Sequence, residues 1–360
     1  MASTRAVYVY ALAALLTLAG SGCGGSNAVP HASGAAPSAA TARPAGSRVR
    51  IREFSDLPNY PRYYFPVALT TGPDGALWVA DDIDQDAGQN AVARISKSGK
   101  RTATFYYQAD ASPAFTDIAT GPDGALWLSD SGDEQIMRLT TDGTFTAFPL
   151  NEDPLSIVAG PDGALWFVEN GFLTAAVCRI TTDGSVTQFS NGIPTDAALQ
   201  DIAVGPDGAL WFTDLNDRIG RITTHGKVKE FSRGITPGSQ PYSIVAGSDG
   251  ALWFTEMAGG RIGRITISGH VTEYSNGMTP LEQPIDLVAG RDGAIWFTEY
   301  KGTYQHENDA KLGRITTSGA ITEYSGGFNP KSGPTGITLG PDGKVWFVET
   351  VTNKLARVAY

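Results

Sequence analysis

The chain has 360 residues and a formal net charge of −10, so it lacks the basic balance that is typical of nucleic-acid-binding domains. Hydrophobic residues make up 41% of the chain, which suffices for a large core. The 43 Gly and 21 Pro, together with many aromatic residues, predict a turn-rich, all-β protein.

The N-terminus has the pattern of an export signal. Arg5 precedes an apolar run at residues 6–19, which is too short for a mature membrane span and has the length of a signal-peptide core. The run leads to GSGC, which is similar to a bacterial lipobox, although Gly20 stands where a leucine is usual. We therefore expect a signal peptide at residues 1–22 and a lipid on Cys23, with plain secretion as the alternative.

A flexible tether is predicted at residues 23–47, because this segment is rich in Ala, Ser, Gly and Pro and has almost no apolar bulk. The folded domain is expected at residues 48–360. Cys178 is the only other cysteine, so no internal disulfide is expected. We expect a monomer in the bacterial cell envelope whose only contact with the membrane is the N-terminal lipid.

One short phrase repeats through the folded domain. Copies of GPDGALW or close variants begin at Gly72, Gly121, Gly160, Gly205, Gly247, Gly290 and Gly340, and each contains one of the seven Trp. The unit at residues 241–275 divides into four short runs, SIVAG, ALWFTE, RIGRIT and HVTEYS, separated by turn residues. Such runs predict four antiparallel strands, and seven repeats of them predict a seven-bladed β-propeller.

The two ends of the domain predict how the ring closes. The last unit ends at KLARVAY, which matches a third strand, so its blade lacks a fourth. RIREFS at residues 50–55 matches the fourth strands of other units. We expect this N-terminal strand to complete the last blade, which leaves only short edges.

The repeated residues are interpreted as scaffold. PDG favours a tight turn, and the Trp is expected to fill the wedge between neighbouring blades. An Arg in each third strand is expected to lie near that Trp, as Arg264 near Trp253. These arginines are Arg94, Arg138, Arg179, Arg221, Arg264, Arg314 and Arg357.

An acidic residue three positions after each Trp ends the second strand. These residues are Asp81, Asp130, Glu169, Asp214, Glu256, Glu299 and Glu349. Each could accept backbone N–H bonds from a neighbouring loop. Alternatively, a divalent cation could bind there, with Glu299 and Glu349 as candidates, because hard ions prefer carboxylate oxygens.

The residues that differ between blades are the candidates for ligand binding. Directly after the residue that opens each first strand come Val67, Thr116, Leu155, Gln200, Tyr242, Ile285 and Thr335. The next position has Ala68, Asp117, Ser156, Asp201, Ser243, Asp286 and Gly336. Both rows are expected to line the mouth of the central channel. Asp117, Asp201 and Asp286 could hold a cation or an amine, or form solvated walls, and Tyr242 could stack on a flat ligand.

Two loops after second strands are long, DDIDQDAGQN in the first blade and YKGTYQHENDAK in the sixth. Long loops on a rigid scaffold often carry binding residues. His306 lies in the second loop, among acidic residues that are more typical of an exposed surface than of a metal site.

The repeat WFTE…IGRIT…G…TEYS…P…G…DG resembles the virginiamycin B lyase (streptogramin lyase) family over about residues 50–360. The resemblance implies a seven-bladed propeller that linearises a cyclic depsipeptide antibiotic by elimination, with a divalent metal, usually magnesium. It also implies a catalytic His directly after the first-strand Pro of each of the last two blades, where this sequence has Ile285 and Thr335. Two family carboxylates match Gly333 and Thr350, and Glu349 lies one position before the second.

Three functions follow as alternatives. The first is binding of a small molecule, peptide or glycan at the channel mouth without turnover. The second is a metal-dependent carbon–oxygen lyase in which Glu299, Glu349 and Asp286 replace the missing histidines. The third is a partner-binding ring in a cell-envelope complex.

Overall fold

The computed structural model describes residues 49–359, apart from residues 56, 58–63, 84–88, 109–113, 172–174, 281 and 301–309. The predicted signal peptide, the tether, Cys23 and His306 lie outside the described residues. Within those residues, no helix is long and apolar enough to span a membrane.

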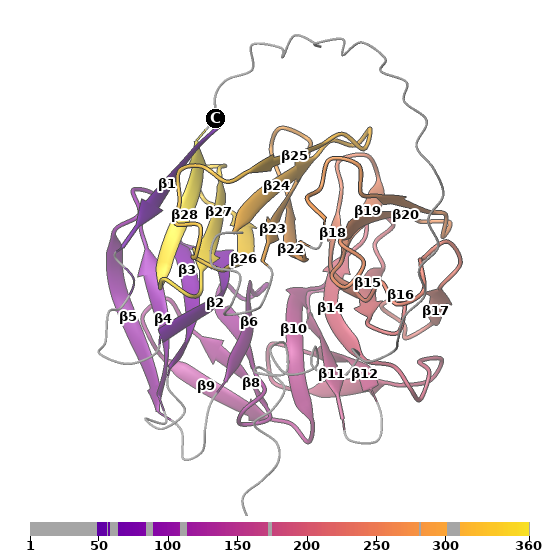
Figure 1. Ribbon diagram of the computed structural model, residues 1–360. Coiled ribbons are helices and arrows are strands. Elements are labelled where there is room, and N and C mark those ends of the chain that lie inside the picture. The colour runs from indigo at the N-terminus through magenta and orange to yellow at the C-terminus, as the bar shows by residue number, and fades with distance from the viewer. Residues whose placement is uncertain are drawn as a thin grey trace, which may run out of the picture.

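The described residues form seven four-stranded antiparallel sheets, which confirms the predicted seven-bladed propeller. Figure 1 shows the sheets arranged as a ring. From the inner to the outer strand, the first three blades are β2 (Tyr64–Thr71), β3 (Leu77–Ile83), β4 (Gln89–Ile95) and β5 (Arg101–Gln108); β6 (Phe115–Thr120), β7 (Leu126–Asp130), β8 (Gln135–Leu139) and β9 (Phe145–Pro149); and β10 (Asp153–Ala159), β11 (Leu165–Asn170), β12 (Ala175–Ile180) and β13 (Val186–Phe189). The next three are β14 (Leu199–Val204), β15 (Leu210–Asp214), β16 (Arg218–Ile222) and β17 (Val228–Phe231); β18 (Pro241–Ala246), β19 (Ala251–Glu256), β20 (Arg261–Thr266) and β21 (Val271–Tyr274); and β22 (Pro284–Ala289), β23 (Ile295–Glu299), β24 (Lys311–Ile315) and β25 (Ile321–Tyr324).

The seventh blade closes the ring as predicted. It consists of β26 (Pro334–Leu339), β27 (Val345–Glu349), β28 (Lys354–Ala359) and, as its outer strand, β1 (Arg50–Phe54). In Figure 1 the indigo β1 lies beside the yellow β28. The register pairs Arg50 with Ala359 and Phe54 with Leu355, and the Phe54 ring stacks on Trp346 with 5.2 Å between centroids. Both ends of the domain are thus held in one sheet.

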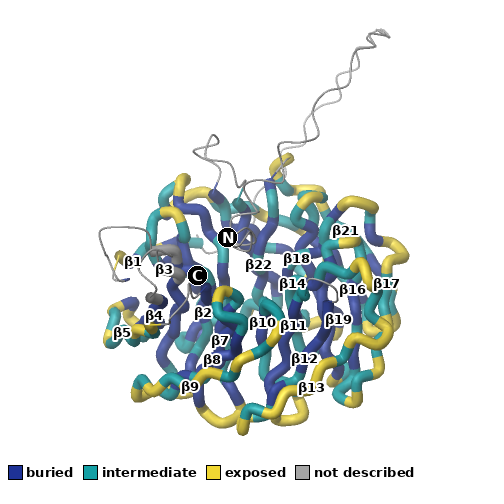
Figure 2. The backbone as a smooth tube through the Cα atoms, turned by 90° about the horizontal axis from the view of Figure 1, so that it is seen from below, coloured by how far each residue is buried: buried dark blue, intermediate teal, exposed yellow. Residues whose placement is uncertain are grey.

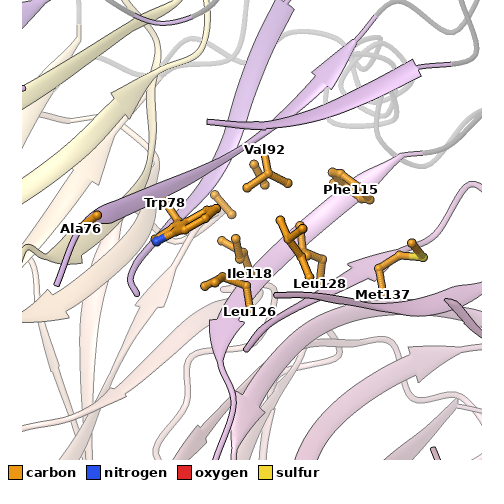
Figure 3. Packing of buried hydrophobic residues seen from close by; sticks show 11 residues of the cluster. Ala76, Trp78, Val92, Phe115, Ile118, Leu126, Leu128 and Met137 are labelled. Carbon is orange, nitrogen blue, oxygen red and sulfur yellow. The ribbon is translucent and has the colours of Figure 1, made fainter. Parts of the chain in front are cut away.

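The Trp of each blade is a wedge between blades, as predicted. All seven are fully buried or nearly so. Trp78, on β3, packs in one cluster with Ile118, Leu126 and Leu128 of the next blade, as Figure 3 shows. Such side chains fill the space between two sheets that splay apart toward the rim.

The Asp of the DG turn at the start of each second strand joins three elements of its blade. In the fifth blade, Trp253 Nε1 donates to Asp249 Oδ1 over 3.1 Å and Arg264 Nε donates to Asp249 Oδ2 over 2.7 Å. The guanidinium carbon of Arg264 lies 5.8 Å from the Trp253 ring centroid. Arg221, Arg314 and Arg357 approach their Trp rings in the same way, so the predicted approach of Arg to Trp is confirmed in four blades. The carboxylate that holds the Arg was not predicted from the sequence.

The middle strands carry most of the core. Figure 2 shows the most deeply buried residues in the middle strands and exposed residues mainly in the outer strands and connecting turns, whereas the inner strands combine buried and intermediate residues. β7, β15, β19, β23 and β27 are buried along their whole length. A rigid ring of this kind holds the ends of its inner strands in fixed positions around the channel.

Candidate functional site at the channel

The inner strands begin at the same face of the ring at which the second strands end. Pro241 pairs with Glu256, Pro284 with Glu299 and Pro334 with Glu349. We call this side the funnel face. Its residues at the channel come from the two positions that follow the opening Pro, or its equivalent, in each inner strand.

A β-bulge shapes the start of the inner strands. In β18, Tyr242 and Ser243 together oppose one residue of β19, Thr255. A bulge of this kind leaves one residue out of the ladder and redirects its side chain. The residues that differ between blades therefore lie at an irregularity of the strand, where backbone groups need other partners.

Threonine hydroxyls supply those partners in three blades. Thr255 Oγ1 accepts from Ser243 N over 2.9 Å and donates to Ile285 O of the next blade over 3.0 Å. Thr213 and Thr298 make the same pair of bonds in their blades. Each threonine thus ties a bulge to the following blade and fixes the neighbouring channel residues.

The structure brings Asp117, Asp201 and Asp286 together through two serines. Ser156 Oγ lies 3.1 Å from Asp117 Oδ2 and 2.6 Å from Asp201 Oδ1. Ser243 Oγ lies 2.9 Å from Asp201 Oδ2 and 2.7 Å from Asp286 Oδ1. We call Asp117, Ser156, Asp201, Ser243 and Asp286 the channel chain.

Each aspartate of the channel chain also joins its own blade to the next one. Asp117, Asp201 and Asp286 accept from the backbone N of Ile157, Ile244 and Ile337, respectively, over 2.8–2.9 Å. Each also accepts from the N–H of the residue that follows it. These carboxyl groups are parts of the ring as well as walls of the channel.

The channel chain ends where the seventh blade meets the first. Ala68 and Gly336 occupy the equivalent positions there and carry no polar side chain. A Cβ on Gly336 would lie 2.8 Å from Val67 O. The two inner strands therefore approach too closely for any side chain at position 336.

Burial changes the ionisation of the channel residues. The side chains of Asp117, Asp201, Tyr242 and Asp286 are partly exposed, but protein surrounds them along the channel. Burial and the charge of Asp201 raise the pKa of Asp117 and of Asp286 to about 7. Burial and the charges of Asp286 and Asp201 raise the pKa of Tyr242 to about 12, which places the phenol near both aspartates.

The positions that match the family's histidines are filled by groups of a different kind. Ile285 is 6% exposed and apolar. Thr335 Oγ1 lies 2.5 Å from Thr350 Oγ1, which in turn donates to Pro66 O over 2.8 Å. Gly333 has a φ of +58°, and a Cβ there would lie 2.6 Å from Val351 Cγ2, so a larger residue would be strained.

The acidic row at the ends of the second strands is buried in every blade. Asp130 accepts from Ala114 N over 2.8 Å, and Asp214 accepts from Ala198 N over 3.0 Å. In these two blades the carboxylate therefore satisfies the backbone of the loop that enters its own inner strand. The glutamates of blades five to seven have different surroundings.

Each of those glutamates lies beside a cation and a second acid. Burial and Glu323 raise the pKa of Glu299 to about 8, against the nearby Lys311 ammonium. Burial and Glu53 raise the pKa of Glu349 to about 7, and Glu349 Oε2 accepts from Thr352 Oγ1 over 2.9 Å. These surroundings favour neutral carboxyls.

A magnesium ion does not fit these surroundings. Glu299 has no exposed surface, and the ammonium group of Lys311 lies nearby. Magnesium keeps several waters in an octahedral shell, which a closed site next to an ammonium group does not allow. Among the described residues, no group of three or more His, Cys, Asp or Glu could hold a metal. The metal role of Glu299 and Glu349 stays a prediction.

Two features of this site do not follow from the sequence pattern. The repeat places Ser156 and Ser243 in the channel row, but it does not predict that each lies between two carboxyls. The threonine before the acid in WFTD and WFTE recurs in three blades, and this repetition is a signal of its role at the bulge. Ligand binding by Tyr242 and the channel aspartates stays a prediction.

Comparisons with known proteins agree with this architecture. A sequence profile of the virginiamycin B lyase family matches residues 61–304 and, in an overlapping match, residues 191–360. No curated protein matches the sequence significantly.

Solved structures of two lyases are similar to the chain. A streptogramin B lyase structure is 30% identical, with a TM-score of 0.72, covering 86% of this chain and 97% of that one. A catalytically inactive histidine-to-alanine variant of virginiamycin B lyase from Staphylococcus aureus, with quinupristin, is also 30% identical. Its TM-score is 0.74, covering 87% of this chain and 100% of the other. A gluconolactonase-like structure with 13% identity and a TM-score of 0.52 shares the fold alone. The chain therefore belongs to the virginiamycin B lyase family.

Proposed function

We propose that this family member binds a small molecule, peptide or glycan at the funnel face and does not carry out the family's elimination. The observation that carries the proposal is the pair Ile285 and Thr335, at the positions where the family has its catalytic histidines. The elimination needs a base that removes a proton next to a carbonyl. An isoleucine side chain cannot accept a proton.

Thr335 is no better suited as a base. A neutral hydroxyl is a weak base, and the hydroxyl of Thr335 donates its hydrogen to Thr350 Oγ1 at 2.5 Å, since Thr350 donates its own to Pro66 O. Thr350 and Gly333 also stand where the family has carboxylates, so the group that would assist a base is missing at the same place. Four positions of the last two blades thus differ from the family pattern, namely Ile285, Gly333, Thr335 and Thr350. Differences at four positions favour loss of the elimination activity more strongly than a difference at one would.

Binding is supported by what remains at the funnel face. The channel mouth combines a phenol at Tyr242, apolar groups such as Ile285 and hydroxyl groups such as Thr335. Sites for small molecules usually combine apolar walls with a few fixed polar groups. The threonine bonds at the bulges hold these side chains in place before a ligand arrives.

A lyase that uses carboxylates instead of histidines is the second candidate, and membership of a lyase family favours it. In that case Glu299, Glu349 and Asp286 would serve as acid–base groups. The surroundings of Glu299 do not fit magnesium, which makes this candidate the weaker of the two.

The proposal includes the location of the protein at the bacterial cell envelope. A lipid on Cys23 would hold the propeller as a monomer at the bacterial cell envelope, with residues 24–47 as a spacer. Replacement Cys23→Ser should move the protein from the membrane fraction to the soluble fraction. An unchanged distribution would favour an anchor of another kind.

A thermal-shift screen with quinupristin tests binding at the funnel face. A ligand at 100 times its dissociation constant stabilises a protein by about 2.7 kcal/mol, which raises Tm measurably. Replacement Tyr242→Ala should reduce the shift, because it removes the aromatic group of the channel mouth. His270→Ala is the matched control, since His270 is exposed in the turn between β20 and β21 at the opposite face. Equal shifts in both variants would place the site elsewhere.

A further inference from the structure

The channel chain contains more close oxygen–oxygen contacts than its hydroxyl groups can satisfy. Ser156 and Ser243 each contact two carboxyl oxygens, which gives four contacts at 2.6–3.1 Å. A serine hydroxyl has one hydrogen to donate. Two hydroxyls therefore account for two of the four hydrogen bonds, and the other two hydrogens must come from carboxyl groups.

The two serines indicate which carboxyl stays ionised, because each of the three aspartates has the same pair of backbone donors. Asp201 is the only member within reach of both serines, and Ile202 N and Ile244 N donate to its two oxygens over 2.7 and 2.8 Å. With the two serine hydroxyls it receives four hydrogen bonds. Burial raises the pKa of Asp201, as it does for the other two aspartates, but these four bonds lower it and favour the carboxylate. Asp117 and Asp286, at the two ends, can then each donate a carboxyl hydrogen to the adjacent serine oxygen.

We propose that the channel chain is a proton-sharing unit that holds two protons and one negative charge, and that loss of these protons loosens the contacts between the inner strands of neighbouring blades. Without the protons, both serine oxygens would face a carboxylate oxygen with no hydrogen between them. Three negative charges would then share one narrow channel. The bonds to Ile157, Ile244 and Ile337, which join successive blades, depend on these same carboxyls.

Few other titratable groups lie on the described inner strands. On the inner strands, the described titratable side chains that do not belong to the channel chain are Tyr242 on β18 and Asp153 at the start of β10. The equivalent positions of β2 and β26 are Ala68 and Gly336, which bring no charge. The Tyr242 phenol stays neutral below its raised pKa of about 12. The pKa of about 7 for Asp117 and Asp286, raised by burial, places release of the protons near neutral pH.

A titration of the full chain labelled with ¹³C at the Asp side-chain carboxyl tests the proposal by NMR. Between pH 4 and pH 9 we expect two channel carboxyls, Asp117 and Asp286, to titrate near pH 7. Ser156→Ala should change the midpoint of Asp117 and leave that of Asp286, and Ser243→Ala should do the reverse. Ser248→Ala is the matched control, because its hydroxyl donates to Gly293 O at an exposed turn. The proposal would be overturned if Asp117 and Asp286 titrated below pH 5 in the unmodified protein, or if neither serine replacement changed their titration midpoints.

Hydrogen exchange provides a second test that needs no variant. The protection factors of the Ile157 and Ile337 amides should fall by about tenfold from pH 6 to pH 8, a change that corresponds to one pKa unit of interaction. The amide of Phe254, which lies within one blade, serves as the control. Constant protection of Ile157 and Ile337 over this range would contradict a link between protonation and blade contacts.

Discussion

Asp249 accepts a hydrogen bond from the indole of Trp253 on one carboxylate oxygen and from the guanidinium of Arg264 on the other. One side chain thus connects the turn, the second strand and the third strand of its blade. The same arrangement recurs in all seven blades, with Nη1 of Arg357 as the donor in the last one. The other carboxylates are Asp74, Asp123, Asp162, Asp207, Asp292 and Asp342. The repeated PDG phrase therefore contributes more than a turn.

Replacement Asp249→Ala should destabilise the ring by about 1–3 kcal/mol, because it leaves the buried indole N–H of Trp253 without an acceptor. Urea denaturation followed by tryptophan fluorescence measures the change. Asp183→Ala, in an exposed turn, is the matched control and should cost less. Equal effects of the two replacements would contradict the role of Asp249.

The unmodified protein and the Asp249→Ala variant should also differ in how their stability depends on pH. Burial would raise the pKa of Asp249, but the bonds from Arg264 and Trp253 lower it overall below its ordinary value of 3.8. A group with a lowered pKa adds stability above its unfolded pKa and loses it as the pH falls through the folded pKa. The stability difference between the unmodified protein and Asp249→Ala should therefore be full at pH 6 and shrink below pH 3.8. A difference that grows in acid would contradict this sign.

Deletion of residues 48–55 should destabilise the whole propeller, because it removes β1 from the seventh blade. Ile51 and Phe54 are each 8% exposed, and burial of one such side chain contributes about 1.5–3 kcal/mol. Differential scanning calorimetry should show a lower Tm. Deletion of residues 24–31, in the predicted tether, is the control. An unchanged Tm after loss of residues 48–55 would contradict closure by the N-terminal strand.

Thr255→Val should cost about 1–3 kcal/mol, because Ser243 N loses its acceptor and Ile285 O loses a donor. Thr255→Ser keeps the hydroxyl and should recover most of that stability. The free energy of unfolding in urea distinguishes the two variants. If the valine and serine variants were equally stable, the hydroxyl would not join the two blades.

Glu299→Gln should flatten the dependence of stability on pH. Burial and Glu323 raise the pKa of Glu299 from 4.5 to about 8. A group with a raised pKa adds stability that is complete below its unfolded pKa and is lost as the pH rises through the folded one. Between pH 5 and pH 8 the unmodified protein should thus lose up to about 1.4 kcal/mol per pH unit from this group, and the variant should not. Parallel stability profiles would show that Glu299 is ionised throughout, and Glu134→Gln serves as the control.

The sequence predicted the fold well because the scaffold needs the same residues seven times. The Trp, the PDG turn and the third-strand Arg recur at matching places, and their repetition indicated blade number, strand order and the closing role of residues 50–55. Alignment of the repeats also placed Asp117, Asp201 and Asp286 in one row, and the structure joins them through serines.

The finer structure of the channel does not follow from the same pattern. Which two carboxyl oxygens a serine such as Ser156 contacts depends on the bulge and on the rotation between blades. Ile285 shows a second limit, since its sequence position matches a catalytic residue of the family while its chemistry does not. A repeat identifies what every blade needs, whereas a site depends on what one or two blades do differently.

The most direct test of binding without turnover is incubation of the purified protein with quinupristin and magnesium, followed by chromatographic separation of the cyclic lactone from its linear isomer. Elimination leaves the mass unchanged, so separation of the two isomers is needed as the readout. We expect quinupristin to stay cyclic, with virginiamycin B lyase from Staphylococcus aureus run in parallel as the positive control. Formation of the linear isomer by this protein would contradict the proposal. If Glu299→Gln or Glu349→Gln then abolished formation of the linear isomer, the protein would be a carboxylate-based lyase.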